Sequence, residues 1–201
     1  MKKFQIREGV DYGRGFTAAT SSAEWSGHLI SLVPMSLHID VRNRLRSNLA
    51  HILSSLDIEA GLILPHAERG ARSAVLFEPF YNTLILHFCI GTYSICEGLG
   101  AAFVLDTLTN DGITGPFIHK KSWRPALINQ LDPEGTTTLG DDLETVILKR
   151  DLIHQDKLGV RADIDWHSIG YESAFLPAKR LIAAIIVRSG ADAPADTNLV
   201  P

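Results

Sequence analysis

In one predicted helix, residues 141–156, Arg150 and His154 occupy positions where the helical pattern predicts apolar residues. Its apolar stripe begins in the first two turns, and steps of three and four residues continue it to Arg150 and His154. Burying an arginine is costly unless it binds an anion. We therefore expect this face to meet a buried carboxylate, a ligand or a partner subunit.

Glu97 is the predicted partner of Arg150 within the chain. It is the only acidic residue in the apolar stretch of residues 83–105. A charge-assisted hydrogen bond between the two side chains would stabilise both of them. The sequence thus predicts an ion pair between Arg150 and Glu97 that joins two helices.

A second group of basic residues lies in residues 117–124, where it is mixed with aromatic side chains. Such a segment can bind phosphates and stack a base. If RNA binds, we expect Lys120, Lys121 and Arg124 to contact its phosphates. The commoner interpretation of such a segment is a solvated loop whose aromatic residues pack inward.

Residues 154–167 contain aspartates and histidines that could act as metal ligands. Asp163, Asp165 and His167 alternate in sequence, and His154 and Asp156 precede them. These residues match no recognised spacing of metal ligands, and loops of this composition are commoner without a metal. We expect no metal site and no cofactor.

The composition is that of one globular domain. Of the 201 residues, 45% are hydrophobic and 21% are charged, which excludes a disordered chain. The net charge of −4 excludes a protein that coats nucleic acid with a basic surface, so any such contact must be a local patch. Cys89 and Cys96 are expected to be buried thiols in a reducing compartment.

Apolar periodicity predicts an all-α fold, a bundle of about five helices. The predicted helices cover residues 40–64, 82–108, 122–131, 141–156 and 172–189. Asp40 is the expected N-cap of the first of them, and Pro79 is expected to precede the second.

The domain is expected to span residues 39–189. Residues 1–38 should form an irregular N-terminal extension, with a short strand near 4–6 or 28–33, and residues 190–201 a flexible tail. The central apolar helix contains His87 and Glu97, which favours a core helix over a membrane span. We expect a cytoplasmic protein without a membrane segment.

Lys149 to Asp156 read Lys-Arg-Asp-Leu-Ile-His-Gln-Asp, and this segment resembles the signature helix of HEPN-like proteins. There an arginine is followed by a polar residue and, about one turn later, by a histidine. The order of helices in residues 40–189 is also similar to that of the family. HEPN-like proteins usually place at least four residues between the arginine and the histidine, whereas three separate Arg150 from His154. Counting from Lys149 restores the spacing with a lysine in the arginine position.

The resemblance implies a chemistry for these residues. Catalytic HEPN-like proteins are metal-independent ribonucleases that act as dimers with two signature helices facing each other, and the RNA 2′-hydroxyl attacks the adjacent phosphate. His154 would be the general acid or base, Arg150 would bind the phosphate, and Asp151 would orient one of them. Many members of the family are non-catalytic, and an altered motif fits them.

The leading functional prediction is therefore a HEPN-like homodimer that acts on or binds RNA or nucleotides in a prokaryotic stress or defence system, with an antitoxin-like protein as a further expected partner. Whether it is an enzyme stays open. The alternative is a non-catalytic helical interaction or ligand-binding protein, in which Arg150, Asp151 and His154 form a polar network at a dimer interface.

Overall fold

We describe a computed structural model of the chain. The structure describes residue 20 and residues 22–68, 71–110, 122–153, 166–190, 192–194 and 197–200, with the backbone alone for 71–77. His154, Lys120 and Lys121 lie outside this part of the chain, as does the strand expected near residues 4–6.

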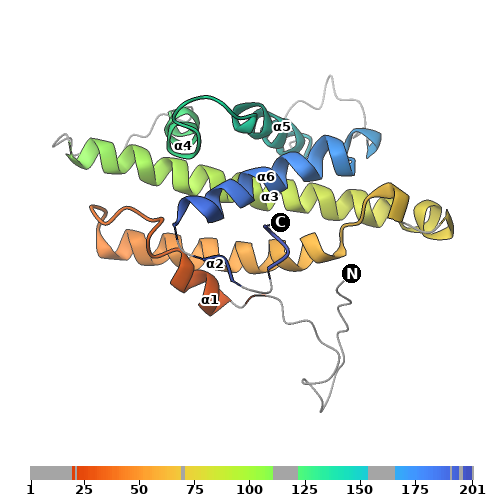
Figure 1. Ribbon diagram of the computed structural model, residues 1–201, viewed down its shortest axis with the longest axis horizontal. Coiled ribbons are helices and arrows are strands. Elements are labelled where there is room, and N and C mark those ends of the chain that lie inside the picture. Colours follow the sequence, from red (N-terminus) through yellow and green to blue (C-terminus); the bar gives the residue numbers. More distant parts are fainter. Residues whose placement is uncertain are drawn as a thin grey trace, which may run out of the picture.

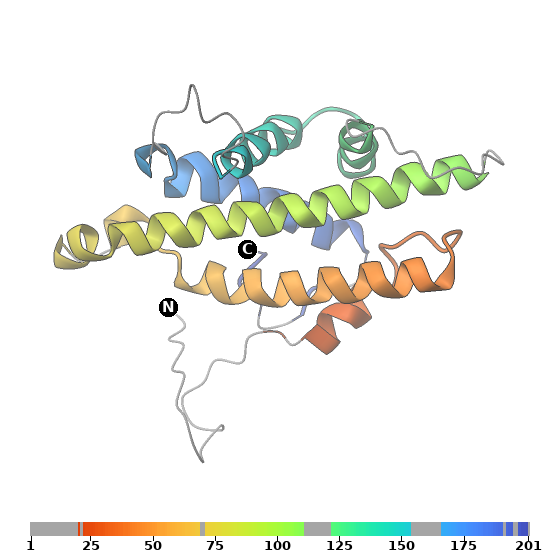
Figure 2. The ribbon, with the colours of Figure 1, turned by 180° about the vertical axis from the view of Figure 1, so that it is seen from behind.

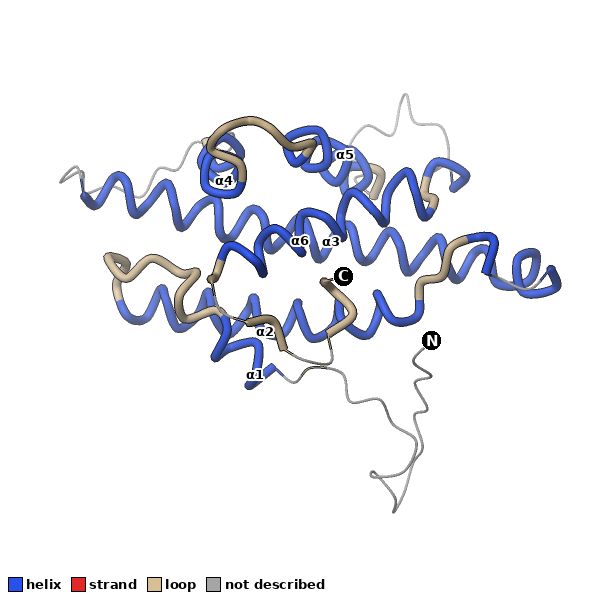
Figure 3. Tube along the Cα trace, in the orientation of Figure 1, coloured by secondary structure: helices blue, strands red, loops and turns tan. Residues whose placement is uncertain are grey.

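The described residues form an all-α fold, as the apolar periodicity predicts, and none of them lies in a strand (Figure 3). The α-helices are α1 Ser22–His28, α2 Ile39–Leu62, α3 Ala71–Asn110, α4 Trp123–Leu131, α5 Leu139–Asp151 and α6 Leu176–Arg188. Three short helical segments, η1 His66–Glu68, η2 Trp166–Ser168 and η3 Tyr171–Phe175, accompany them.

The long helix α3 is the centre of the fold, and the other helices pack around it. It contacts α2 on one side, α4 and α5 on the other, and α6 as well. Figures 1 and 2 show α2 and α3 side by side, with α1 beyond α2 and with α4 and α5 across α3 from them. Side chains of α3 fill the core, among them Ile85, Phe88, Ile95 and Leu99.

Two glycines of α3 allow this close packing. A Cβ atom at Gly91 would lie 2.8 Å from Cδ2 of Leu56 in α2. A Cβ atom at Gly100 would lie 2.6 Å from the backbone oxygen of Trp123, the first residue of α4. The missing side chains therefore let α2 and α4 approach the backbone of α3.

The start of α3 differs from the sequence-based expectation. The structure begins this helix at Ala71 and places Pro79 within it, whereas the sequence suggested a helix from Asn82 onward. A proline costs one backbone hydrogen bond but does not force a helix to end when its surroundings support the flanking turns. The bond lost is the one that the carbonyl of residue 75 would accept, because Pro79 has no N–H to donate.

Helix α2 also begins differently from the prediction. Its N-cap is His38, whose Nδ1 accepts a hydrogen bond from the backbone N–H of Asp40 at 3.3 Å. Asp40 lies in the first turn, where a negative charge still favours the helix dipole. The predicted cap was therefore two residues too late, because a histidine took the role usually filled by Ser, Thr, Asp or Asn.

The residues before α2 are more ordered than the irregular extension that we expected. Residues 22–28 form helix α1, and residues 28–33, one candidate for a strand, are in helical and turn conformation. Trp25, Leu29 and Val33 are buried in the common core. The described part of the extension therefore belongs to the domain, because it supplies apolar side chains to it.

The described end of the C-terminal tail also packs against the domain. The buried carboxylate of Asp57 in α2 accepts hydrogen bonds from the Thr197 hydroxyl at 3.0 Å and from the Asn198 backbone N–H at 2.5 Å. The same carboxylate accepts from the Thr20 backbone N–H at 3.0 Å. Leu199 is fully buried, whereas its sequence suggested a tail with little to bury.

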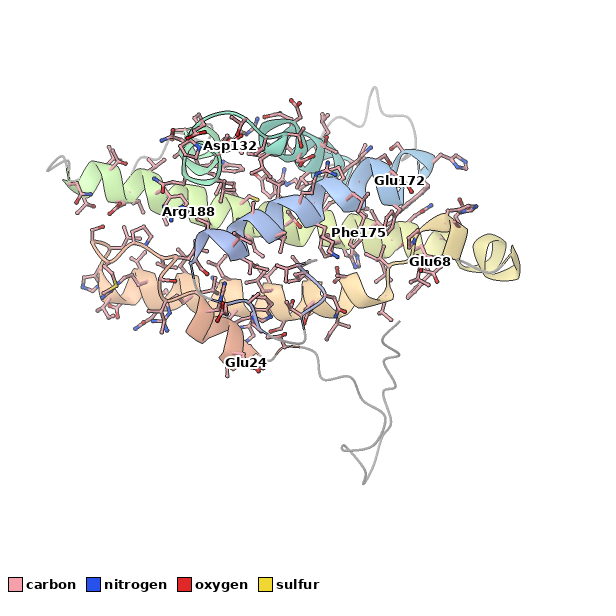
Figure 4. All side chains as sticks on the ribbon, viewed as in Figure 1. Glu24, Glu68, Asp132, Glu172, Phe175 and Arg188 are labelled. Carbon is pink, nitrogen blue, oxygen red and sulfur yellow. The ribbon has the colours of Figure 1, made fainter. Side chains whose placement is uncertain are left out.

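Helices α5 and α6 are joined by a fork-like ion pair. Arg180 donates from Nε and NH2 to the two carboxylate oxygens of Asp142, at 2.8 and 2.5 Å. Asp142 is buried, and such paired geometry stabilises a buried carboxylate. Segment η3, which leads into α6, packs on α3 through Phe175, the residue labelled in Figure 4. The Phe175 ring centroid lies 4.9 Å from that of Phe88.

Length and composition alone would also allow part of α3 to cross a membrane. The segment Glu78–Asn110 has a mean hydropathy of 1.5 in its most apolar window. In the structure this segment lies among α2, α4, α5 and α6, the arrangement expected of a core helix. A cytoplasmic location stays a prediction from the sequence.

Candidate functional site

The predicted site residues that the structure describes come from three neighbouring helices. Glu97 lies in α3, Arg124 in the first turn of α4, and Lys149, Arg150 and Asp151 in the last turn of α5. Helix α3 contacts both α4 and α5. The three helices therefore bring residues far apart in sequence onto one side of α3.

Tyr93 of α3 is the residue that connects them. The Arg150 guanidinium carbon lies 4.6 Å from the centre of the Tyr93 ring, a cation–π contact. The Tyr93 hydroxyl donates to Oε1 of Glu97 at 3.0 Å. Arg150 donates from NH1 to Oδ1 of its neighbour Asp151 at 2.9 Å.

The expected ion pair between Arg150 and Glu97 is therefore wrong. Among the described residues, Arg150 pairs with Asp151, and the ring of Tyr93 stands where the carboxylate was expected. The physical reason is the position of Glu97, which is exposed and whose charge water therefore already solvates. Tyr93 and Glu97 are four residues apart in α3, so this bond within one helix was visible in the sequence.

Trp123 and Arg124 of α4 extend the contacts around Tyr93. The Trp123 ring meets the Tyr93 ring edge to face, with centroids 5.7 Å apart and planes at 86°. The Arg124 guanidinium lies 5.9 Å from the Trp123 ring centre and pairs with Glu144 of α5 at 3.2 Å. We call Tyr93, Glu97, Trp123, Arg124, Glu144, Arg150 and Asp151 the aromatic–arginine cluster.

The cluster holds two arginines and three carboxylates, so an anion would have to compete with a carboxylate for a guanidinium. The side chains of Arg124 and Arg150 are 31% and 30% exposed, and each pairs with one carboxylate. Burial and the hydrogen bond to Glu97 raise the pKa of Tyr93, while the two arginines oppose that shift. Tyr93 therefore stays a neutral hydroxyl at physiological pH.

This arrangement can bind an anion but cannot stack a base on tryptophan. Trp123 is 3% exposed, so its faces are used within the protein. The guanidinium of Arg150 is held against Tyr93 and is exposed in part, which prepares it for a phosphate group at a low entropic cost. Such a phosphate would compete with Asp151 for NH1 of Arg150.

Lys149 has a different environment from Arg150. Its charge acts on the thiol of Cys89, opposing the burial that raises the Cys89 pKa to about 12. Burial raises the pKa of Cys96 to about 12 as well. Both cysteines are free and buried, as predicted, so neither supplies a thiolate nucleophile.

Sequence reasoning missed one titratable side chain in α2, on the other side of α3 from this cluster. Glu59 of α2 acts electrostatically on Cys89, and its Oε2 atom is buried without a hydrogen-bond partner. Burial raises the pKa of Glu59 to about 7, and the hydrogen bond from Ser55 reduces the shift. Its position at the inner edge of α2 was not visible from the weak amphipathic pattern of that helix.

The remaining predicted residues cannot be placed. His154, Lys120 and Lys121 lie outside the described residues, as do Asp163 and Asp165 of the metal hypothesis. Within the part of the chain that the structure describes, no three His, Cys, Asp or Glu residues are grouped so as to hold a metal ion. The ribonuclease roles of Arg150, Asp151 and His154 thus stay predictions.

Comparisons of the chain with models of protein families, with curated proteins and with solved structures found no match. The similarity to HEPN-like proteins therefore depends on the signature segment and the order of the helices alone.

Proposed function

We propose that this protein is a HEPN-like helical protein that binds RNA or nucleotides through the aromatic–arginine cluster. The observation that carries the proposal is the position of Arg150. Its guanidinium lies against the Tyr93 ring at 4.6 Å and remains exposed in part. Arg150 also lies in the last turn of α5, from which the chain continues directly toward His154.

The chemistry of an RNA substrate at this place follows from the side chains. Arg150 would hold the phosphate and oppose the charge that grows on it in the transition state. His154 would take the proton of the 2′-hydroxyl or give one to the leaving 5′-oxygen. The 2′-oxygen forms a bond to phosphorus as the bond to the 5′-oxygen breaks, leaving 2′,3′-cyclic phosphate and 5′-hydroxyl ends. This route requires no metal.

The first experiment tests whether the protein cleaves RNA. Wild type, His154→Ala and the control His66→Ala, which changes an exposed histidine of η1, are incubated with mixed RNA in EDTA. We expect wild type and His66→Ala to leave 2′,3′-cyclic phosphate ends and His154→Ala to leave the RNA intact. Absence of cleavage by folded wild type would remove the enzymatic part of the proposal.

A second experiment tests binding by itself. Asp151→Asn frees NH1 of Arg150 from its ion pair and should raise the affinity for a short single-stranded RNA about three- to tenfold. Arg150→Gln should lower it by a similar factor, and Arg44→Gln, an exposed arginine of α2, should change it less than twofold. If Asp151→Asn leaves RNA binding unchanged, Arg150 does not contact the phosphate.

A non-catalytic helical dimer is the second candidate, and a specific observation favours it. Leu148 is 65% exposed and Ile153 is 40% exposed, and these residues flank Arg150 and Asp151 in the chain. Exposed apolar side chains beside polar groups are typical of interfaces between proteins. In this interpretation Arg150 and Asp151 form part of the contact between two copies of the chain.

A further inference from the structure

A polar cleft lies between α1 and α2, away from the aromatic–arginine cluster. It has a volume of about 280 Å³, and two alanines complete its lining. Its polar lining residues are Ser22, Ser26, Asn43, Arg46, Ser47 and His51. In Figures 1 and 2, α3 separates α1 and α2 from α4 and α5. This cleft is therefore a separate site, and an inference about it goes beyond the proposed function.

Helical spacing explains why these side chains meet. In α2 the lining residues fall at positions 43, 46, 47, 50 and 51, which is one face of a helix at steps of three and four. In α1 they fall at positions 22, 23 and 26. Helices α1 and α2 pack against each other, and the small serine and alanine side chains leave space between them.

Arg46 carries a charge that no acidic side chain balances within the described residues. None of the cleft-lining residues is acidic, and the Nε atom of Arg46 is buried without a hydrogen-bond partner. The Nε atoms of Arg42 and Arg124 are also buried without a partner, but Arg42 donates to Sδ of Met35 and Arg124 pairs with Glu144, whereas Arg46 alone of the three lines the cleft. A partly buried guanidinium without a counter-charge is costly, and a bound anion would remove that cost.

The other polar groups of the cleft suit the same ligand. Ser22, Ser26 and Ser47 carry hydroxyls and Asn43 carries an amide, all of which can donate hydrogen bonds. Nδ1 of His51 lies 2.6 Å from the Ser47 carbonyl oxygen. That carbonyl can only accept, so Nδ1 carries the proton of this bond, and Nε2 of the neutral ring is an acceptor that offers no donor to a phosphate. The donors of the cleft are therefore the Arg46 guanidinium, the hydroxyls and the amide.

We propose that this cleft binds the phosphate group of a small phosphorylated molecule, with Arg46 as its principal contact. The planar guanidinium fits two phosphate oxygens, and the hydroxyl and amide groups supply donors for the rest. The volume of about 280 Å³ lies just below the usual range of ligand sites, which suits a phosphate with a small organic part. A folded protein segment would not fit into it.

Calorimetric titration of the full chain tests the proposal, with phenyl phosphate and inorganic phosphate as probes. Wild type should bind phenyl phosphate saturably, and Arg46→Gln should weaken that binding about tenfold or more. Ser47→Ala, which removes one hydroxyl donor, should weaken it less. Arg44→Gln is the matched control, since Arg44 is an exposed arginine of the same helix that does not line the cleft, and its affinity should stay within twofold of wild type.

Several results would overturn the proposal. The first is the absence of saturable binding by wild type whose circular dichroism shows a folded helical protein. The second is an equal loss in Arg46→Gln and Arg44→Gln, which would indicate attraction by general surface charge. Binding of inorganic phosphate but not of phenyl phosphate would show a site for the free ion and exclude an organic ligand. RNA binding plays no part in this assay, so its outcome is independent of the proposed function.

Discussion

At the scale of single residues, this protein keeps three carboxylates in very different environments. Asp142 is buried and paired with Arg180, and Asp57 is buried and bound by backbone and side-chain donors. Glu59 has one buried oxygen without any partner. Hydrogen bonds and an ion pair stabilise the charged forms of Asp142 and Asp57. The buried oxygen of Glu59 has no such partner, so burial disfavours the charged form of Glu59.

The pH dependence of stability follows from Glu59. Its pKa is about 7 in the folded protein and near 4.5 without burial. Folded protein thus holds a proton between these values that the unfolded chain has released, so the free energy of unfolding falls as pH rises from about 5 through 7. The full shift corresponds to about 3 kcal/mol, and solvent screening should reduce it to about 1–2 kcal/mol.

Glu59→Gln tests this, since glutamine resembles the protonated acid. Urea unfolding should show the variant more stable than wild type at pH 8 by about 1–2 kcal/mol, with little difference at pH 5. Glu134→Gln, a change in an exposed loop residue, serves as the control and should show no such pH-dependent gain. Equal stability of wild type and Glu59→Gln at pH 8 would show that Glu59 is ionised without cost.

At the scale of elements, the approach of α4 to α3 depends on the absence of a side chain at Gly100. Its Cβ would lie 2.6 Å from a backbone oxygen of Trp123, and a backbone atom cannot move aside as a side-chain end can. At Gly140 of α5 nothing lies within 4 Å of the added atom. The same substitution should therefore have opposite effects at these two helical positions.

Gly100→Ala should destabilise the fold by about 1–3 kcal/mol, because the steric cost exceeds the gain in helix propensity. Gly140→Ala should be neutral or stabilising by up to about 1 kcal/mol. Chemical denaturation of both variants measures the difference. A stabilised Gly100→Ala variant would mean that α4 does not press on α3 at this point.

The elements also show what a sequence can predict. Apolar periodicity located α4, α5 and α6, because it is a local property. It did not locate the end of α5, which stops at Asp151 and not at the predicted residue 156. The early start of α3 was not predicted because Pro79 is tolerated within the helix. Helix α1 was missed because its burial depends on contacts with α2, which leave no local pattern.

The candidate site was predictable to a similar degree. The sequence singled out Glu97, Arg124 and Arg150 as separate candidates, but it did not predict that the helices of Arg124 and Arg150 both contact α3. The pairing did not follow, because Tyr93 lies between Glu97 and Arg150. The cleft around Arg46 could not be predicted either, because it forms only where α1 packs against α2.

At the scale of the whole molecule, the exposed apolar residues near the end of α5 concern its assembly. Leu148 of α5 is 65% exposed, and Ile153, in the turn that follows α5, is 40% exposed. If this face joins two copies of the chain, Leu148→Lys should convert a dimer into a monomer, because a lysine ammonium is costly to bury at an apolar contact.

Light scattering coupled to size-exclusion chromatography measures the mass of each variant. Ile30→Lys is the control, since Ile30 is 51% exposed and lies two residues after the end of α1. Figure 1 shows α1 across α3 from α5. We expect wild type and Ile30→Lys to elute as dimers and Leu148→Lys as a monomer. A monomeric wild type would exclude the homodimer, and a dimeric Leu148→Lys would place the interface elsewhere.

The buried carboxylate of Asp57 has a consequence for how the chain can be rearranged. It accepts hydrogen bonds from Thr20 and from Thr197 and Asn198, so positions 20 and 198 lie next to each other in space. A linker could join Val200 to Thr20, which keeps the buried Leu199 in the chain, and new chain ends could be opened in the exposed residues 133–137 between α4 and α5. Such a circularly permuted protein would retain all six described α-helices, and a covalent link would join the two segments that Asp57 holds by hydrogen bonds.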